Sequence, residues 1–503
     1  MTLRLQFQAM LRGCLQGRWA FALAMFAGAL TSAAFAPLAW WWLAPLTPAL
    51  LILLWQDASP RRAALLGFLF NAATFGIGTY WLYISIHGFG QAPIWLAIVL
   101  MAGLVGIMGL YHAALGFAVA RWLPARGWAR WMLGIPALWL LIEWWRGWFL
   151  SGFAWLSLGY SQIDTVLAAL APVGGVYLVS LAILVIAGAL ATLVLGRGHE
   201  RQSATLVILL LIGAAFALHG RPWTRAAGPA IEVAIVQGAI PQDQKWLDSN
   251  LDASLKRYRE LNAQVLGTPL IVWPESAAPD LANHIAPWLG SVYREARASG
   301  SSIVMGLVRA DDRLENYYNS VLAMDEELMW YDKDHLVPFA EFFPVPGFIR
   351  NWLRLMSLPY ADFTRGGARQ PPLQAAGLKL GASICYEDAY GSSQARWFAD
   401  VTALVNVTND AWFAHSSARY QHFQIARMRA LESGRYLIRA ANDGVSAIIG
   451  PDGKVRTQAA EYQPTVLRGH IEPRSGLPPY GRVGNWLVVL LAAAMVVAAR
   501  RLV

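Results

Sequence analysis

Residues 378–388 read LKLGASICYED, an apolar run that stops at a thiol, Cys385, and then presents two carboxylates. A short apolar run of this length, bounded by polar residues, predicts a buried strand. A second stretch has the same form: Val272-Trp273-Pro274-Glu275-Ser276 is an apolar run that ends at a carboxylate. Because α/β folds place ligands at the ends of their strands, both stretches predict reactive side chains at strand ends.

The surrounding sequence repeats this pattern. Strands are predicted at 231–236, 270–273, 302–306, 320–324, 378–384 and 403–407. Helices are predicted between them, at 250–266, 286–299 and 419–434. Alternation of short strands with helices over about 250 residues indicates an α/β domain with buried sheets.

The composition of the whole chain shows that the remaining residues are unusually apolar. Of the 503 residues, 56% are hydrophobic and only 14% are charged, whereas soluble domains average about 25% charged residues. The apolar residues concentrate at 19–219 and 485–499, and a bilayer core needs roughly 20 apolar residues per helix. We predict eight spans: 19–36, 38–55, 63–86, 93–120, 131–149, 166–195, 203–219 and 485–499. The predicted domains are therefore a membrane domain at 1–219, a globular domain at 220–484 and a last span with its tail at 485–503.

The arginines of the short loops predict the orientation of these spans. With eight spans, the basic segments all fall on one side: the N-terminal arm, 56–62, 121–130, 196–202 and the tail. Since basic loops stay in the cytoplasm, both termini are expected there and 220–484 is expected on the far side of the membrane. This asymmetry also accounts for much of the net charge of +9, so nucleic-acid binding is not expected. The first span is too long for a cleaved signal peptide and is expected to remain as an anchor.

The predicted topology places the two cysteines, Cys14 and Cys385, on opposite sides of the membrane, so they cannot pair. Cys14 is interpreted as incidental. A thiol that acts as a nucleophile needs a base to take its proton and a cation to favour the thiolate. Glu275 is a candidate base, and Lys333 is a candidate for lowering the thiol pKa and holding an oxyanion. The residue types alone leave open that Cys385 is a buried structural cysteine.

Three short motifs carry a resemblance to a known family: Trp-Pro-Glu at 273–275, Lys-x-His-Leu-Val-Pro-Phe-x-Glu at 333–341 and Cys-Tyr-Glu at 385–387. They resemble the nitrilase superfamily and, within it, the membrane-embedded apolipoprotein N-acyltransferase family. The resemblance covers the whole chain. It implies an αββα sandwich, outside the cytoplasm, joined to about seven N-terminal spans and one C-terminal span of a bacterial inner-membrane protein.

The resemblance also implies a ping-pong acyl transfer. Cys385 would take the sn-1 acyl chain of a phospholipid, commonly phosphatidylethanolamine, as a thioester. The α-amine of a diacylglyceryl-cysteine at a lipoprotein N-terminus would then accept it. Matching residue by residue, Glu275 would be the base, Lys333 the oxyanion-stabilising cation, and Glu341 a supporting carboxylate. Supporting, pocket-shaping or gating roles would fall to four further residues: Tyr386, Glu387, Trp246 and Trp412. The backbone N–H of Tyr386 is a candidate second oxyanion donor. No metal or other cofactor is expected, and the protein is expected to be a monomer.

The stretch after Glu341 is too apolar for a solvated loop. We predict that 342–363, including Phe343 and Trp352, forms a lid that touches the membrane; an ordinary buried helix is the alternative. Glu143 and Arg146 lie three apart near the outer end of a span, and two interpretations stay open. They could meet a lipid headgroup, or they could form a self-neutralising helical pair.

The remaining histidines do not have metal-site spacing. His87 and His112 are interpreted as interface or packing residues, and His335, His415 and His422 are not interpreted as ligands. Two other functions were weighed. The first is a membrane-tethered amidase of the nitrilase type, which keeps the site and changes the substrate. The second is a transporter or receptor with a large external binding domain, for which Cys385 would be dispensable.

Overall fold

The computed structural model describes residues 17–342 and 363–502, and the chain divides into two compact units. The helical unit takes in the chain up to Tyr83, Pro93–Arg221 and the chain from Val483. The sheet unit takes in Pro222–Arg482 and also Ile84–Ala92. The sequence had assigned this last segment to the end of the third span and the loop after it, and its packing with the sheet unit was not expected.

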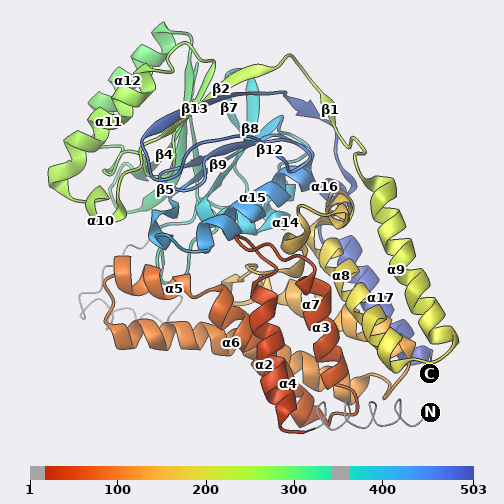
Figure 1. Ribbon diagram of the computed structural model, residues 1–503. Coiled ribbons are helices and arrows are strands. Elements are labelled where there is room, and N and C mark those ends of the chain that lie inside the picture. Colours follow the sequence, from red (N-terminus) through yellow and green to blue (C-terminus); the bar gives the residue numbers. More distant parts are fainter. Residues whose placement is uncertain (1–16, 343–362, 503) are drawn as a thin grey trace. The chain divides into compact units, whose positions relative to one another are not determined.

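The sheet unit contains two six-stranded sheets (Figure 1). The first has the order β13-β2-β3-β4-β5-β6 and the second the order β12-β11-β10-β9-β8-β7. The strands of the first sheet are β2 (Ile231–Gln237), β3 (Leu270–Val272), β4 (Ser302–Ala310), β5 (Tyr317–Met324), β6 (Leu328–Asp332) and β13 (Thr465–Ile471). Those of the second are β7 (Leu373–Ala375), β8 (Leu378–Ile384), β9 (Ala403–Thr408), β10 (Leu437–Ala441), β11 (Ala447–Ile449) and β12 (Val455–Gln458). A short pair, β1 (Arg225–Ala226) and β14 (Arg474–Ser475), stands apart from both sheets. All six strands predicted from the sequence are confirmed.

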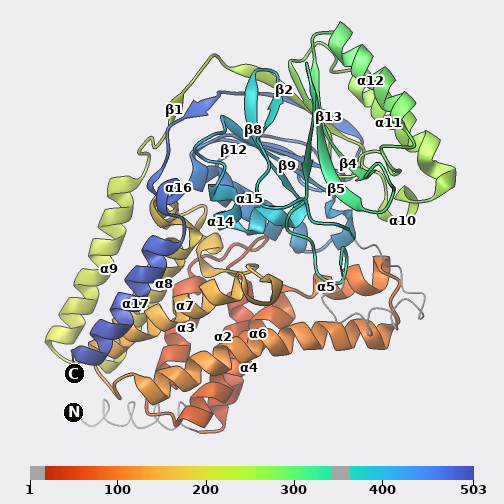
Figure 2. The same ribbon diagram turned by 180° about the vertical axis from the view of Figure 1, so that it is seen from behind.

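The period-2 alternation of the strands explains the layers. In β2, Val233 and Ile235 pack into the core between the two sheets, whereas Ala234 and Val236 pack on the other face against two helices. These helices are α11 (Leu251–Ala263) and α12 (Ala286–Ala298). The second sheet is covered by α14 (Gly391–Ala395) and α15 (Ala418–Ser433), on the side away from α11 and α12 (Figures 1 and 2). The unit is therefore the expected αββα sandwich, and the three long helices predicted for it are confirmed.

Each sheet has a parallel centre, β2-β3-β4 in the first and β8-β9-β10 in the second. The edge strands are antiparallel; β13, for example, pairs with β2 from Thr465 opposite Gln237 to Ile471 opposite Ile231. Because the parallel strands end at a common edge, the residues that follow β3, β8 and β9 are brought together. Those residues include Glu275, Cys385 and Asn409.

The helical unit consists of α2 (Trp19–Ser32), α3 (Leu43–Leu54), α4 (Pro60–Gly78), α5 (Trp81–Tyr83), α6 (Ile94–Trp122), α7 (Ile135–Arg146), α8 (Ala171–Leu195), α9 (His199–Leu218) and α17 (Trp486–Arg501), together with short 3-10 and π-helical turns. Within the described residues, three helices are long and apolar enough to cross a membrane: Ile94–Trp122, Val166–Leu195 and His199–Leu218. A bent pair, Pro60–Gly78 with Trp81–Phe89, is a fourth candidate. The chain is therefore a membrane protein by its helices, while the number of eight spans stays a prediction.

Two predicted spans differ in shape from the expectation. The run 19–36 is helical only to Ser32, because Pro37 restricts the residues before it and removes a backbone donor. The run 63–86 is bent by 52° between Gly78 and Trp81. Close helix contacts rely on small residues: a Cβ added to Gly67 would lie 2.2 Å from the backbone oxygen of His112, so α4 and α6 meet backbone to backbone.

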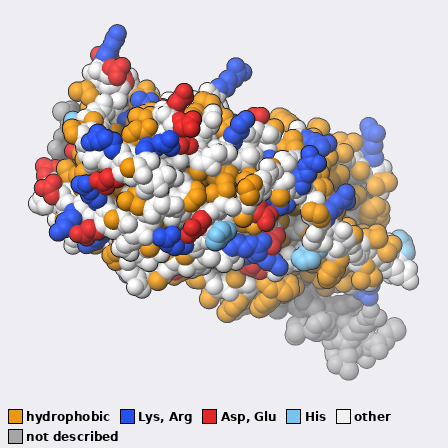
Figure 3. All heavy atoms as spheres, turned by 90° about the horizontal axis from the view of Figure 1, so that it is seen from above, with side chains coloured by type: hydrophobic (Ala, Val, Ile, Leu, Met, Phe, Trp, Pro, Cys, Tyr) orange, Lys and Arg blue, Asp and Glu red, His pale blue; other side chains and the backbone are white. Residues whose placement is uncertain are grey.

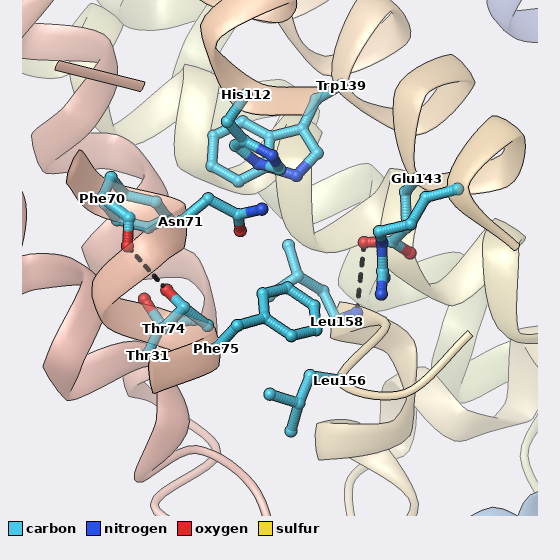
Figure 4. A pocket seen from close by; sticks show the side chains of 11 residues that line it. Thr31, Phe70, Asn71, Thr74, Phe75, His112, Trp139, Glu143, Leu156 and Leu158 are labelled. Atoms are coloured by element: carbon cyan, nitrogen blue, oxygen red, sulfur yellow. Dashed lines mark hydrogen bonds between the residues drawn. The ribbon is translucent and has the colours of Figure 1, made fainter. Parts of the chain in front are cut away.

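Glu143 and Arg146 are both buried, and neighbouring groups satisfy each of them separately. Glu143 accepts hydrogen bonds from Ser180 Oγ (2.5 Å) and from the Leu158 N–H (3.3 Å). Arg146 donates to two backbone oxygens, those of Phe153 and Trp155, at 2.6 Å each. Both residues line a small cavity of about 20 Å³. Figure 4 shows Glu143 at this cavity. This volume suits one water and excludes a lipid headgroup from that cavity.

Charged side chains of both signs are interspersed over the face seen in Figure 3. Exposed ion pairs are present among the described residues, such as Arg468 with Glu232 and Arg456 with Asp452. A nucleic-acid site would instead gather basic residues on one face. On the face in view, the excess positive charge does not form such a patch.

Candidate active site

Glu275 stands three residues beyond the end of β3, where Pro274 ends the strand. Its Oε1 accepts a hydrogen bond from Asn319 Nδ2 at 2.7 Å, and its Oε2 accepts one from the Asn409 N–H at 2.9 Å. The side chain is largely buried. Two neutral donors therefore fix the position of the Glu275 carboxylate, with one hydrogen bond to each of its oxygens.

Lys333 follows β6 directly and is almost fully buried. Its Nζ lies 2.8 Å from Glu341 Oε1 and 3.9 Å from Glu275 Oε1. Asn319 Nδ2 also donates to Glu341 Oε1, at 3.0 Å, so one amide joins both carboxylates. Burial lowers the pKa of Lys333, but Glu341, Glu275 and Cys385 together raise it well above its usual range. The ammonium is thus held charged in a site with little water, where a cation stabilises an oxyanion most strongly.

Cys385 follows β8 directly and begins a 3-10 turn, Cys385–Ala389. Its φ of 49° is in the left-handed region, which non-glycine residues rarely adopt. Burial raises the pKa of the thiol, and the negative charge of Glu275 raises it further, while Lys333 acts in the opposite direction. The resting thiol is therefore protonated at neutral pH. Attack by the sulfur requires transfer of this proton to a base, and the carboxylate of Glu275 is close enough to influence the thiol.

Glu387 links the turn of Cys385 to the loop of Lys333. Its carboxylate accepts from the backbone N–H groups of Asp334 (2.8 Å), His335 (3.0 Å) and Ile384 (2.9 Å). Burial raises the pKa of Glu387, and these donors counteract the rise. The oxygens of Glu387 accept hydrogen bonds from the loop after Lys333 and from the residue before Cys385. These contacts hold the two segments together, so Glu387 is a positioning group. Tyr386 is buried, with its ring edge to face against Tyr390.

The sequence-predicted gating residues have different surroundings. Trp246 is about half exposed and follows the short helix α10 (Gln242–Lys245). Trp412 is 39% exposed, and its ring lies edge to face with that of Phe89 at 6.2 Å. Ser85 Oγ donates to the backbone oxygen of Trp412 at 2.8 Å. Phe343, Trp352 and the predicted lid, apart from Phe342 and Phe363 at its ends, lie outside the described residues.

Three polar residues of the site were given no role from the sequence. Asn319 and Asn409 hold Glu275, and the fully buried Lys245 donates from Nζ to the backbone oxygen of Glu275 at 3.2 Å. Burial lowers the pKa of Lys245 to about 8, although Glu275 and Asp443 act against this shift. None of the three lies in the three short motifs that carry the resemblance, and the sequence around an amide or a lysine does not reveal its partner.

Comparison with known proteins shows which family patterns the chain carries. The sequence pattern of the family described as "Carbon-nitrogen hydrolase" matches residues 232–475, and that described as "Apolipoprotein N-acyltransferase N-terminal domain" matches residues 27–189. Among solved structures, the sheet unit is similar to a CN-hydrolase superfamily protein from Xanthomonas campestris at 18% identity, covering 49% of this chain and 91% of that chain, with a TM-score of 0.36.

Fold and site together define a carbon-nitrogen hydrolase-type domain, with a cysteine, a lysine and carboxylates at its strand ends, carried by a membrane-spanning region. The chain is 40% identical to the apolipoprotein N-acyltransferase of Methylococcus capsulatus, over 95% of both chains. It is also 40% identical to that of Chromobacterium violaceum, over 95% of this chain and 92% of the other, and 38% identical to that of Pseudomonas putida, over 94% and 95%. The chain belongs to the apolipoprotein N-acyltransferase family.

Proposed function

We infer that this bacterial membrane protein is an acyltransferase that moves an acyl chain from a phospholipid to the N-terminal amine of lipoproteins. The observation that carries this conclusion is the full-length similarity to apolipoprotein N-acyltransferases. The group of buried Glu275 and Lys333 with the partly buried Cys385 supports it, because acyl transfer through a thioester needs a base, an oxyanion stabiliser and a nucleophile.

The first half-reaction forms the thioester. Cys385 Sγ attacks the carbonyl carbon of the sn-1 ester while its proton passes to Glu275. The oxyanion that develops on the carbonyl oxygen is stabilised by the Lys333 ammonium and by the backbone N–H of Tyr386. When the carbonyl re-forms, the C–O bond of the ester breaks and the departing glycerol oxygen takes the proton from Glu275. The products are a lysophospholipid and an acylated Cys385.

The second half-reaction runs through the same groups. The α-amine of the diacylglyceryl-cysteine attacks the thioester carbonyl and gives a proton to Glu275. The C–S bond then breaks, and the sulfur takes up the proton. The products are an amide at the lipoprotein N-terminus and the free thiol of Cys385. The high pKa of the thiol suits both steps, since the thiol enters and leaves the cycle protonated.

Several finer features belong to the same proposal. The donor is phosphatidylethanolamine, the protein is a monomer of the inner membrane with eight spans, both termini are cytoplasmic, and the sheet unit is periplasmic. The arginine pattern of the loops supports this orientation.

The test is to incubate the purified full-length protein with phospholipid vesicles and look for a hydroxylamine-sensitive acyl adduct on Cys385 by mass spectrometry. The adduct and an equal amount of lysophospholipid are expected, and both should be lost in Cys385→Ala. Active protein without an adduct would refute the covalent mechanism. Because the sheet unit matches the carbon-nitrogen hydrolase pattern, release of ammonia from small amides, with unchanged lipoprotein N-termini after depletion, would instead support a membrane-tethered amidase.

A further inference from the structure

A buried cluster of four charged residues lies directly beneath the turn of Cys385. Asp388 comes from that turn, Asp410 from the turn after β9, His422 from α15 and Arg439 from β10. Each is no more than 1% exposed. Four ionisable groups without access to water are costly to bury unless they neutralise one another.

The contacts within the cluster provide this neutralisation. His422 Nδ1 lies 2.9 Å from Asp410 Oδ1, and His422 Nε2 lies 3.0 Å from Asp388 Oδ1. Arg439 spans the same two carboxylates, at 3.0 Å to Asp410 Oδ2 and 3.3 Å to Asp388 Oδ2. Two cations therefore bridge the same pair of anions, so the net charge of the buried cluster is zero when His422 is protonated.

The contacts of His422 and its charged surroundings together favour a ring protonated on both nitrogens. Nε2 faces two acceptors, Asp388 Oδ1 and the backbone oxygen of Cys385, and is therefore a donor. Nδ1 faces Asp410 Oδ1, to which it donates when the ring is protonated. Arg439 Nη2 also lies 2.9 Å from His422 Nδ1, because both groups bind the carboxylate of Asp410. Burial and the charge of Arg439 lower the pKa of His422, but Asp388 and Asp410 raise it more, to about 9.

The cluster touches both halves of the active site through the backbone. His422 Nε2 lies 3.1 Å from the backbone oxygen of Cys385, the residue with the left-handed φ. On the other side, Asp410 directly follows Asn409, whose N–H donates to Glu275. A strained backbone persists only where its surroundings hold it. The cluster of four charged residues is therefore placed to hold Cys385 and the Asn409 N–H, which donates to Glu275, at a fixed separation.

We propose that His422 and Arg439 form a cationic clamp that, through Asp388 and Asp410, positions the Cys385 turn against the turn that holds Glu275. Both are positioning residues, since the described contacts join them to other side chains and to backbone, and they act through Cys385 and Asn409. The clamp rests on the proposed thioester chemistry for its effect on acylation, whereas its effect on thiol position is independent of that chemistry.

The test compares wild type with His422→Gln in the full-length protein in detergent. Glutamine keeps a hydrogen-bonding side chain but cannot donate to both aspartates from opposite ends and carries no charge. Two rates are measured well below the unfolding temperature: single-turnover thioester formation from phospholipid, and alkylation of Cys385 by iodoacetamide. We expect the saturating acylation rate to fall by on the order of 100-fold, as misplacement of a nucleophile by about 1 Å does. The half-saturating phospholipid concentration should be unchanged, and alkylation should slow as well.

A matched control lies on the same helix. Glu432 is fully buried and its Oε2 lies 2.7 Å from Arg429 Nη1, and none of the described ion pairs joins it to His422 or Arg439. Glu432→Gln should lower the unfolding temperature and leave both rates unchanged. Should His422→Gln fail to fold, Asp388→Asn keeps the shape of the cluster, removes one charge, and is expected to slow both reactions.

Wild-type rates of acylation and alkylation in His422→Gln or, if that variant does not fold, in Asp388→Asn would overturn the clamp. If wild type itself forms no acyl adduct, the proposed function fails, and the alkylation comparison still decides the clamp on its own.

Discussion

Gly306 in β4 packs against the backbone that carries Glu275, and its substitution should move the base. A Cβ added at Gly306 would lie 2.5 Å from Glu275 Cα and 2.8 Å from the Pro274 oxygen. These are backbone atoms, so a side-chain rotation cannot relieve the clash. Ordinary contact begins near 3.4 Å, so the two segments must separate by about 0.9 Å. The Gly306 oxygen accepts from the Ala277 N–H at 2.9 Å, which ties the two segments together and forces the displacement onto Glu275.

We therefore expect Gly306→Ala to slow thioester formation on Cys385 by on the order of 100-fold, because a shift of about 1 Å misplaces the base. Overpacking should also cost about 1–3 kcal/mol of unfolding free energy. Single-turnover acylation with radiolabelled phospholipid measures the first effect, and denaturant unfolding in detergent measures the second.

The control for this experiment is Gly469→Ala in β13. There the added Cβ would lie 2.7 Å from the terminal methyl of Ile448, a side-chain end that can move. It should destabilise the sheet unit slightly and leave acylation unchanged. A Gly306→Ala protein that folds and acylates at the wild-type rate would refute the argument that this glycine fixes the position of Glu275.

Three further substitutions test other parts of the site. Glu341→Gln removes the charge paired with Lys333 at 2.8 Å; since this charge raises the lysine pKa, the alkaline limb of the acylation rate should move down by about one pH unit or more, and an unmoved limb would contradict the pairing. Lys245→Met should raise the free energy of unfolding at pH 7 by about 2 kcal/mol, the gain of about 3 from removing a buried charge less about 1 for a lost hydrogen bond. Because the folded pKa of Lys245 is about 8, below the usual 10.5, wild-type stability should rise with pH between these values and that of the variant should not, as unfolding curves at several pH values would show. Trp412→Ala should raise the half-saturating phospholipid concentration several-fold with the limiting acylation rate unchanged; a fall in the limiting rate alone would instead place this residue in the chemistry.

The sequence predicted the strands that lead into the motifs because each is a short apolar run bounded by proline, glycine or a polar residue. It did not predict the other six strands of the two sheets, which are β6, β7, β10, β11, β12 and β13. Residues 465–471 of β13 contain threonine, arginine and histidine and are mostly half-buried. This strand exists because it pairs with β2, more than 200 residues earlier in the chain. Pairing over such a distance leaves no local pattern to read.

The helical unit shows the same limit in another form. Hydropathy located the apolar segments, since a lipid-facing helix needs a long apolar stretch. It did not predict that the third segment bends by 52°, nor that Ile84–Ala92 packs with the sheet unit. Side-chain contacts decide both features, such as the ring of Phe89 against Trp412.

For the site, the sequence by itself determined which groups are proposed to carry the chemistry. A thiol, an amine and carboxylates at strand ends, in motifs that match a known family, were sufficient to name Glu275, Lys333 and Cys385. The tertiary structure decided how these groups are held: by Asn319, Asn409 and the cluster around His422. The physical reason is that a reactive group has a recognisable type, whereas a supporting amide or ion pair is defined only by its partners. Those partners come from different strands, and only the closed pair of sheets brings them within hydrogen-bonding distance.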